Sequence, residues 1–303
     1  MDFKKARKGF AYFIGWAALR ACSLTVSLIP AGRLYGFAKG IASLGYIFAR
    51  KQRKIALQSL SIAFGDEKSP SQIRRIARDS FISMAKSAVE ILYLLDKPEI
   101  LKRRIVLCGK ENLDAALAKN KGVILVSAHF GNFPLLLGRL SVEGYKAAGI
   151  MRPMKDKRTE EFFRGKRNRL NIQTIYSQPR NACVEATIHM LRQNSAVFIP
   201  IDQNFGTSGV FVNFFGTQAA TATGPVVLAQ RTGAAIVPCF IVRETDNSHK
   251  IIFEPELTLE QGSTSGETIR INIQNLTRII ESYIRRYPAE WGWIHRRWKA
   301  KPN

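Results

Sequence analysis

Cysteine and histidine are scarce in this chain, and neither is spaced as in a metal site or a disulfide framework. The 303 residues include four cysteines with no C-x-x-C pair and four histidines with no H-E-x-x-H pattern. Zinc sites need closely spaced ligands, and disulfide-rich domains need many cysteines in a short chain. We therefore expect no metal ion, no cofactor, and reduced thiols in a cytosol-facing protein.

Two common catalytic loops are also missing. The sequence contains neither a G-x-S-x-G nucleophile elbow nor a G-x-x-x-x-G-K-[ST] phosphate loop, which excludes the commonest serine hydrolases and P-loop enzymes. It has no internal repeat and no low-complexity linker. Any chemistry must come from side chains outside these motifs.

Acidic residues are few compared with basic ones. Lys plus Arg number 46 against 23 Asp plus Glu, which gives a net charge of +23. Such a balance favours anionic partners: phospholipid, phosphorylated glycolipid or nucleic acid. The sequence has no OB or RRM signature in which cations are interleaved with stacking aromatic rings. We therefore expect a membrane or lipid partner and no nucleic acid.

The N-terminal region is apolar enough to insert into a membrane or to lie at its surface. Residues 10–29 are almost wholly apolar and follow a basic cluster at 4–8, and their length fits a span of about 20 residues. Arg20, near the middle, costs about 2.5–3.5 kcal/mol on insertion scales unless it reaches the interface or the helix lies there. A cleaved signal peptide and an ordinary core helix are the alternatives. We predict a membrane anchor, spanning or interfacial, within residues 1–50.

The remaining residues predict a helical segment followed by an α/β domain. Residues 70–95 have helical periodicity, with Glu90 an isolated acid on or beside the apolar face. Short apolar runs then alternate with helical segments; these runs lie at 104–107, 123–126, 147–151, 172–176, 196–201, 235–242 and 250–254. This pattern predicts a mixed, largely parallel sheet flanked by helices. We expect one catalytic domain at 51–303, helical over 51–100 and α/β over 101–303, behind a helical membrane-anchoring region.

Residues 122–137 form the centre of this arrangement. A buried strand is expected to end near Ser127, and a helix is expected to begin near Pro134 with Asn132 or Phe133 as its cap. His129 then lies at the carboxyl end of the strand, where its near-neutral pKa suits a general base. A histidine satisfied by a backbone carbonyl in the core is the alternative.

Two further polar residues follow predicted strands. Arg152 comes directly after the strand at 147–151, and Asp202 and Gln203 follow the strand at 196–201. Ligands collect at the carboxyl ends of the strands in such sheets, so these side chains and His129 are expected at one edge. A structural ion pair for Arg152 and a turn cap for Asp202 are the alternatives.

The order and spacing of several motifs resemble a known enzyme family over nearly the whole chain. They are Ser-Ala-His-Phe-Gly-Asn-Phe at 127–133, Arg-Pro at 152–153, Pro-Ile-Asp-Gln at 200–203, Gly-Val-Phe-Val-Asn-Phe-Phe-Gly at 209–216, Ala-Thr-Gly at 222–224, Thr-Gly-Ala at 232–234 and Trp-Gly-Trp-Ile-His-Arg-Arg-Trp-Lys at 291–299. Together with the apolar N-terminus, they resemble the lipid A biosynthesis late acyltransferases within the lysophospholipid acyltransferase group. The last segment mixes aromatic rings with cations, as interfacial or phosphate-contacting surfaces do.

The sequence departs from that family at one position. The family carries Asp or Glu five residues after the histidine, where this chain has Pro134. Such a carboxylate orients the imidazole and stabilises its charged form. Asp202 is the first candidate for a substitute acid and Glu90 the second. Alternatively, Asn132 or a backbone carbonyl orients His129, or the chain binds lipid without catalysis.

The resemblance also implies a reaction and its partners. An acyl thioester, on acyl carrier protein or coenzyme A, would donate its chain to a hydroxyl of a lipid A precursor, with His129 taking the proton. The backbone amides of the turn at 131–133, beginning with Gly131, and the side chain of Arg152 would stabilise the oxyanion. Four further residues would contact substrate: Phe130, Asn132, Phe133 and Gln203. Core packing explains the two phenylalanines nearly as well. Another glycolipid, a lysophospholipid or an aminolipid is the alternative acceptor, and the implied location is the bacterial inner membrane with the catalytic domain facing the cytoplasm.

Overall fold

The computed structural model describes residues 3–302, which form helices packed around a central sheet. The helices are α1 (Phe3–Leu28), α2 (Ala31–Phe48), α3 (Arg50–Phe64), α4 (Pro70–Leu94), α5 (Pro98–Arg104), α6 (Lys110–Ala118), α7 (Phe133–Val142), α8 (Lys157–Arg169), α9 (Arg180–Arg192), α10 (Gly224–Thr232) and α11 (Ser265–Arg286), with the single turns η1 (Gly206–Ser208) and η2 (Pro288–Glu290). The strands are β1 (Ile105–Cys108), β2 (Val123–Ser127), β3 (Ala147–Met151), β4 (Gln173–Tyr176), β5 (Ala196–Pro200), β6 (Val210–Phe214), β7 (Thr217–Thr221), β8 (Ala235–Arg243) and β9 (His249–Phe253).

The main sheet is mixed and mostly parallel. Its order is β1-β9-β8-β2-β5-β3-β4. The five strands from β8 to β4 run parallel to one another, whereas β9 is antiparallel to β8, and β1 is parallel to β9. β6 and β7 form a separate antiparallel hairpin. The predicted fold class is therefore confirmed.

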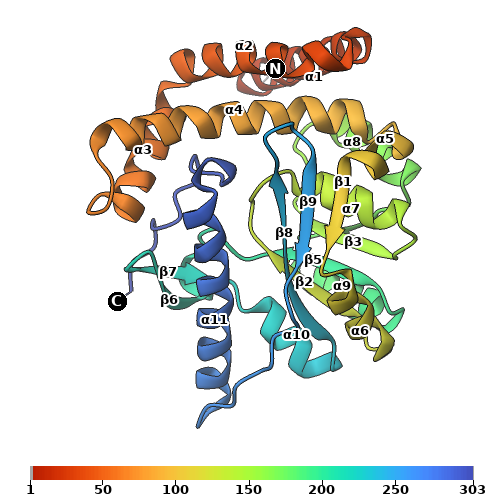
Figure 1. Ribbon diagram of the computed structural model, residues 1–303, viewed down its shortest axis with the longest axis vertical. Coiled ribbons are helices and arrows are strands. Elements are labelled where there is room, and N and C mark those ends of the chain that lie inside the picture. Colours follow the sequence, from red (N-terminus) through yellow and green to blue (C-terminus); the bar gives the residue numbers. More distant parts are fainter. Residues whose placement is uncertain (1–2, 303) are drawn as a thin grey trace.

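Helices cover both faces of the sheet, and alternate strand residues enter two different cores. Ile124 and Val126 of β2 pack in the core that also contains residues of α3, α10 and α11. Val123 and Leu125 pack in the core that contains residues of α5, α6 and α7. Successive strand residues point to opposite faces, so a strand covered on both sides must be apolar throughout. Figure 1 shows α11 on one side of the sheet and α7 on the other.

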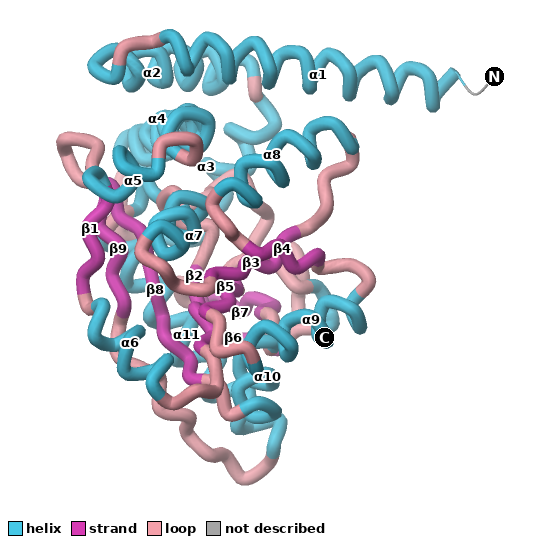
Figure 2. The backbone as a smooth tube through the Cα atoms, turned by 90° about the vertical axis from the view of Figure 1, so that its right-hand side faces the viewer, coloured by secondary structure: helices cyan, strands magenta, loops and turns pink. Residues whose placement is uncertain are grey.

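The N-terminal helices form a further layer above α4 (Figure 2). A small apolar core joins them, in which Val26 of α1 and Leu34 of α2 meet Val89 of α4. α4 begins with a capping box in which Ser69 and Gln72 exchange side-chain to backbone hydrogen bonds. The predicted helical N-terminal third is therefore confirmed.

The outer surfaces of α1 and α2 are strongly apolar. The exposed large hydrophobic side chains on these two helices are Phe10, Phe13, Ile14, Leu24, Leu28, Ile41, Leu44, Ile47 and Phe48. Over Arg7–Leu28, α1 is long and apolar enough to cross a membrane, and only 6% of its residues in the most apolar window are buried. Apolar patches of this kind mark membrane or protein contacts, so α1 is a candidate membrane anchor.

One prediction about the C-terminal segment is wrong. Residues 291–299 were expected at an aromatic and basic surface, yet Trp291, Trp293 and Trp298 are 1%, 0% and 6% exposed. The rings pack against one another and against Phe214 of the β6–β7 hairpin. Arg297 is also buried. Its guanidinium tolerates burial because it donates to the backbone carbonyls of Gln203 and Ala220. The three tryptophans and Arg297 therefore belong to the core, whereas Ile294, Arg296 and Lys299 of the same segment are exposed.

Candidate active site

The turn that follows β2 is held by the buried strand before it and by hydrogen bonds to the C-terminal segment. All five β2 residues are buried, and the chain leaves the sheet through Ala128 into His129. The backbone N–H of Gly131 donates to the Glu290 carbonyl at 2.8 Å, and the Gly292 N–H donates to the His129 carbonyl at 3.2 Å. The turn is thus held against the C-terminal segment before α7 begins at Phe133, with Asn132 at the N-cap position.

Gly131 is required by the shape of this turn. Its φ is +57°, and a Cβ atom built there would lie 2.0 Å from the Ile241 carbonyl oxygen. We expect Gly131→Ala to lower the free energy of unfolding by about 2–5 kcal/mol, because the left-handed conformation and the overlap both add cost. Chemical denaturation measures the loss.

Gly216 offers a matched control for this substitution. Its φ is +72°, and no atom lies within 4 Å of the position that a Cβ atom would take. Gly216→Ala should therefore lose only the conformational part, about 1–2 kcal/mol. Equal losses in the two variants would show that contact with the Ile241 carbonyl is unimportant.

His129 is paired with a buried carboxylate. Its Nδ1 lies 2.8 Å from Oδ1 of Asp202. β2 and β5 are neighbouring parallel strands in which Ser127 is opposite Pro200, so residues just after them meet at one edge of the sheet. The Asp202 side chain is 2% exposed, whereas the imidazole is 34% exposed. One side of the ring is thus buried against the acid and the other is open.

Trp291 is the second partner of Asp202. Its indole N–H donates to Oδ2 at 2.7 Å, so each carboxylate oxygen accepts one hydrogen bond. Burial alone would raise the pKa of Asp202, but the nearby His129 and the indole outweigh it and lower this pKa to about 2. Burial would likewise lower the pKa of His129, and Asp202 outweighs it, so that this pKa lies above its ordinary value.

This geometry fixes the tautomer of the imidazole. An ionised carboxylate only accepts hydrogen bonds, so Nδ1 carries the proton that points to Asp202. Nε2 of the neutral ring is then an acceptor. A ring oriented in this way is able to take a proton from a bound hydroxyl group.

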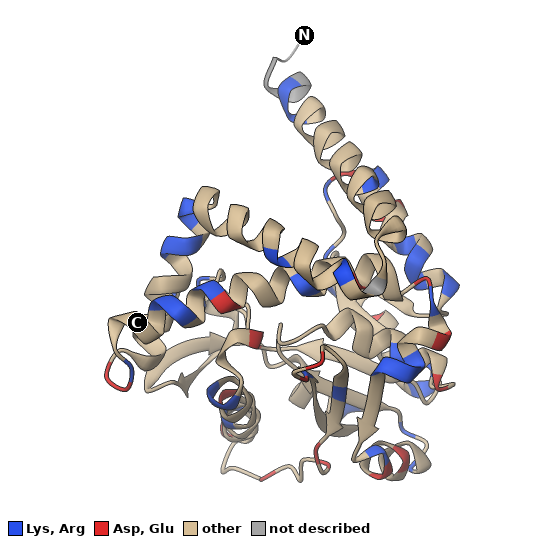
Figure 3. Cartoon of the chain, turned by 45° about the horizontal axis from the view of Figure 1, so that its top comes forward, with Lys and Arg blue, Asp and Glu red and all other residues tan. Residues whose placement is uncertain are grey.

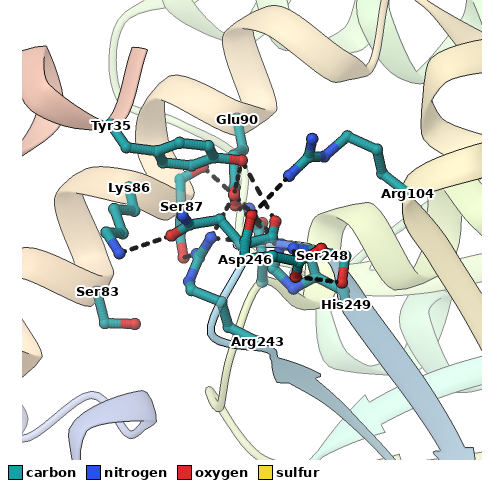
Figure 4. A network of polar contacts seen from close by, with 12 residues as sticks. Tyr35, Ser83, Lys86, Ser87, Glu90, Arg104, Arg243, Asp246, Ser248 and His249 are labelled. Atoms are coloured by element: carbon teal, nitrogen blue, oxygen red, sulfur yellow. Dashed lines mark hydrogen bonds and ion pairs between the residues drawn. The ribbon is translucent and has the colours of Figure 1, made fainter. Parts of the chain in front are cut away.

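Glu90 lies in a separate buried network of polar contacts (Figure 4). Its carboxylate accepts from the Asn132 amide at 2.9 Å and from the Tyr35 hydroxyl at 3.0 Å. It is also paired with Arg243, and Nε2 of His249 lies 3.2 Å away. Within the part of the chain that the structure describes, Glu90 makes no hydrogen bond to His129. The acid that contacts the histidine is Asp202.

The residues that contact Glu90 keep its carboxyl group ionised. Glu90 is 0% exposed, and burial alone would raise the pKa of its carboxyl group. His249 and Arg243 outweigh burial and lower that pKa to about 2. Arg243 also donates to the Ser87 hydroxyl at 3.1 Å. α4, β8, β9 and the N-cap of α7 are therefore joined by one charged cluster.

The remaining predicted residues fall into two groups. Phe133, Arg152 and Gln203 are partly or largely exposed around the turn, and Phe133 packs edge-on to the imidazole with ring centroids 5.4 Å apart. Phe130 is 1% exposed and packs against Phe240 and Tyr283, so it belongs to the core. Across residues 3–302, no cluster of three His, Cys, Asp or Glu side chains is arranged to hold a metal ion.

Sequence reasoning missed the residues that support Asp202. Trp291 contacts its carboxylate, and Arg297 donates to the Gln203 carbonyl at 3.1 Å and to the hairpin at Thr221. Both residues lie in a segment that the sequence suggested was a surface. The only available signal was the density of aromatic and basic side chains between positions 291 and 299.

The chain is similar in sequence to several bacterial acyltransferases. The lipid A biosynthesis palmitoleoyltransferase of Escherichia coli (strain K12) is 27% identical over 303 aligned residues, covering 96% of this chain and 92% of the relative. The lauroyltransferase of the same strain is 26% identical over 302 residues, covering 96% and 93%. A phosphatidylinositol mannoside acyltransferase of Mycobacterium tuberculosis (strain CDC 1551 / Oshkosh) is 28% identical over 196 residues, covering 64% and 60%.

The family comparison covers almost the full length. The model of the bacterial lipid A biosynthesis acyltransferases matches residues 1–300. The match includes the N-terminal helices, the His129 turn and the buried C-terminal segment. The chain therefore belongs to the bacterial lipid A biosynthesis acyltransferase family.

Proposed function

We propose that this acyltransferase moves a fatty acyl chain from an acyl thioester to a hydroxyl group of a lipid A precursor, with His129 as general base. The observation that supports the proposal is the 2.8 Å contact between His129 Nδ1 and Asp202 Oδ1. It occurs at the carboxyl ends of parallel strands, where ligands collect in such sheets. The family sets the reaction class, and the pair supplies a base for it.

The reaction proceeds by direct transfer. Nε2 of His129 takes the proton of the acceptor hydroxyl while its oxygen attacks the thioester carbonyl. Asp202 stabilises the imidazolium that forms. The tetrahedral intermediate then collapses, the carbon–sulfur bond breaks, and the imidazolium returns the proton to the leaving thiolate. No side chain is acylated, so no nucleophile elbow is needed.

The oxyanion is stabilised at the start of α7. The first amides of a helix have no intrahelical acceptor and favour negative charge. The Gly131 N–H is already bonded to the Glu290 carbonyl, which assigns this role to the amides of Asn132 and Phe133. Asp202, and not Glu90, takes the part of the acid that Pro134 replaces.

The acceptor is held at the membrane surface. In this proposal residues 1–50 anchor the chain in the bacterial inner membrane, and residues 51–303 face the cytoplasm as the catalytic domain. The exposed apolar side chains of α1 and α2 support the membrane anchor. Acyl carrier protein is the donor favoured by the basic composition, with acyl coenzyme A as the alternative. The mycobacterial relative is named for a mannosylated lipid, which supports another glycolipid as the second candidate acceptor.

Arg152 is proposed to bind a phosphate group of the acceptor. It is exposed directly after β3, at the same edge of the sheet as His129. Arg152→Gln should raise KM for a phosphorylated acceptor by about 10-fold or more, the value of one charge-assisted hydrogen bond, while kcat stays within about twofold. Lys146→Gln, at the opposite end of β3, is the control, and equal kinetics in the two variants would exclude this role.

The proposed function is tested by transfer of a labelled acyl group in detergent. Purified protein is given acyl carrier protein or coenzyme A thioesters and one of three acceptors: a lipid A precursor, a phosphatidylinositol mannoside or a lysophospholipid. We expect the lipid A precursor to be acylated with the highest kcat/KM. Preference for either other acceptor would replace the proposed substrate, and no transfer to any of them would reject it.

A further inference from the structure

A groove lies between the anchor helix α1 and the basic helix α8. Its volume is about 530 Å³, and it is lined by Trp16, Arg20, Lys157, Arg158, Glu161 and Phe162. None of these residues belongs to the turn around His129 or to the segment after β5 that contains Asp202. The groove therefore needs an explanation separate from acyl transfer.

Arg20 is the most unusual residue of this groove. It is the only charged residue in the sequence between Lys8 and Arg33, in the middle of an apolar helix where charge is costly. Its guanidinium carbon lies 5.7 Å from the centre of the Phe162 ring. Among the side chains that the structure describes, no carboxylate lies within 4.0 Å of its guanidinium nitrogens. Its charge is turned toward α8 and is not neutralised there.

The other charges of the groove leave it basic. Arg158 is paired with Asp156 at 2.8 Å, and Glu161 is paired with Arg164 at 2.6 Å. Lys157 is exposed, and none of the described side chains offers it a salt bridge. Two cations thus remain available for an anion, and the one acid in the lining is already compensated.

The groove is continuous with the apolar surface of α1. Phe10, Phe13 and Ile14 are 65%, 47% and 52% exposed on the same helix. Trp16 is half-buried, and the Arg158 guanidinium lies 5.5 Å from its ring centre. Tryptophan beside cations and exposed apolar side chains is the composition of a membrane interface. Figure 3 shows the uncharged length of α1 projecting away from the body.

We propose that this groove binds the headgroup of an anionic phospholipid of the membrane in which α1 lies. The lipid phosphate contacts Arg20 and Lys157, and the acyl chains lie along the exposed apolar side chains of α1. Guanidinium and ammonium groups both bind phosphate through charge-assisted hydrogen bonds. A bound headgroup would join α1 to α8 and fix the orientation of the catalytic domain relative to the membrane.

The test compares partition of the full chain into vesicles of phosphatidylcholine alone and of phosphatidylcholine with phosphatidylglycerol. The double variant Arg20→Gln and Lys157→Gln should lose about 25-fold in its preference for the anionic vesicles, about fivefold for each cation near the surface. Binding to neutral vesicles should stay unchanged, because the apolar faces are intact. Native mass spectrometry should show one retained phosphatidylglycerol on the native chain and none on the variant.

A charge-matched control separates a site from a general effect of charge. Lys121→Gln and Arg192→Gln remove two exposed cations near α6 and α9, away from α1. This pair should retain the preference and the bound lipid, and Arg20→Lys should retain most of both. Equal losses in the groove variant and the control would overturn the proposal, as would a groove variant that still carries the lipid. No acyl donor is present, so the result is independent of the proposed reaction.

Discussion

A His129→Asn enzyme is expected to transfer acyl groups about 10²–10⁴-fold more slowly at saturating substrate than the native enzyme, the usual contribution of a general base. The asparagine amide is able to replace Nδ1 as the donor to Asp202. The buried carboxylate therefore keeps a partner and the variant should fold. Single-turnover transfer in detergent measures the rate without product release.

His189 provides the control for this substitution. It is exposed on α9, and its ring contacts only Gln193 of the same region at 2.9 Å among its described hydrogen-bond partners. His189→Asn should leave kcat unchanged. Native kcat in the His129→Asn enzyme would reject His129 as the base.

Asp202→Asn should lower the transfer rate nearly as much, because it changes the tautomer of the His129 ring. Two donors, the His129 ring and the Trp291 indole, point at the two carboxylate oxygens. An amide has only one oxygen, and the indole can only donate. The amide N–H₂ must then face Nδ1, which places the ring proton on Nε2. The histidine is held in the wrong tautomer, an error that costs up to about 10⁴-fold in comparable triads.

The pH dependence should identify the pair independently. Transfer needs neutral imidazole, so kcat/KM should rise with pH and level off above the pKa of His129. Because Asp202 raises this pKa above its ordinary value of 6.5, the native inflection should lie above that value. In Asp202→Asn the residual activity should have its inflection at lower pH, since burial remains while the negative charge is gone. An unchanged inflection would mean that another group titrates.

The sheet was predictable because its central parallel strands, β2, β5 and β8, are buried and apolar on both faces. β3 was expected at the residues where it occurs, and most other strands were displaced by only one or two residues. The β6–β7 hairpin was missed. Its turn has positive φ at Phe215 (+53°) and Gly216 (+72°), as two-residue hairpins require. Phenylalanine replaces the usual Asn or Asp there, so the sequence carries no recognisable signal.

The pairing of His129 with Asp202 followed from topology, whereas the support of Asp202 did not. Both residues directly follow adjacent parallel strands, which sequence patterns locate well. Trp291 is 89 positions from Asp202 and approaches through an irregular segment. Likewise, the basic partners of Glu90, Arg243 and His249, lie 153 and 159 positions away on β8 and β9. An isolated acid on a helix face gives no indication of which distant basic residue it contacts.

Replacing Glu90 with alanine is expected to lower the free energy of unfolding by about 3–5 kcal/mol, the cost of leaving a buried charge without its partner. The Arg243 side chain is 5% exposed and that of His249 is 0% exposed. Neither can turn to water when the carboxylate is removed. Chemical denaturation at neutral pH measures the loss.

An exposed ion pair gives the matched comparison for stability. Glu67 is 50% exposed and pairs with Arg285 at 2.8 Å, so Glu67→Ala should cost no more than about 1 kcal/mol. The double variant Glu90→Leu and Arg243→Met removes both charges. It should be more stable than Glu90→Ala, in which the buried Arg243 guanidinium keeps only the longer 3.9 Å ion pair with the Glu290 carboxylate. A Glu90→Ala protein as stable as Glu67→Ala would show that the network contributes little.

Acid titration should show the same network. The pKa of Glu90 is lowered to about 2 from an ordinary 4.5, so its ionised form contributes stability at higher pH, and this contribution is lost as pH falls from 4.5 toward 2. Glu90→Gln cannot titrate, and its stability should fall less over this window. A fall of the same size in both proteins would assign the acid sensitivity to other carboxyl groups.

Glu90→Gln also decides between the two acids that the sequence offered in place of Pro134. The amide keeps the shape of the carboxyl group and one oxygen for Asn132, so the turn should stay in place and kcat should fall by less than about 10-fold. The inflection of kcat/KM should not move, because Glu90 makes no described contact with the imidazole of His129. Asp202→Asn should show the reverse, with a large loss of kcat and a displaced inflection. If Glu90→Gln instead abolishes transfer with a displaced inflection, while Asp202→Asn is nearly native, Glu90 is the acid that acts with His129 and the roles assigned above are exchanged.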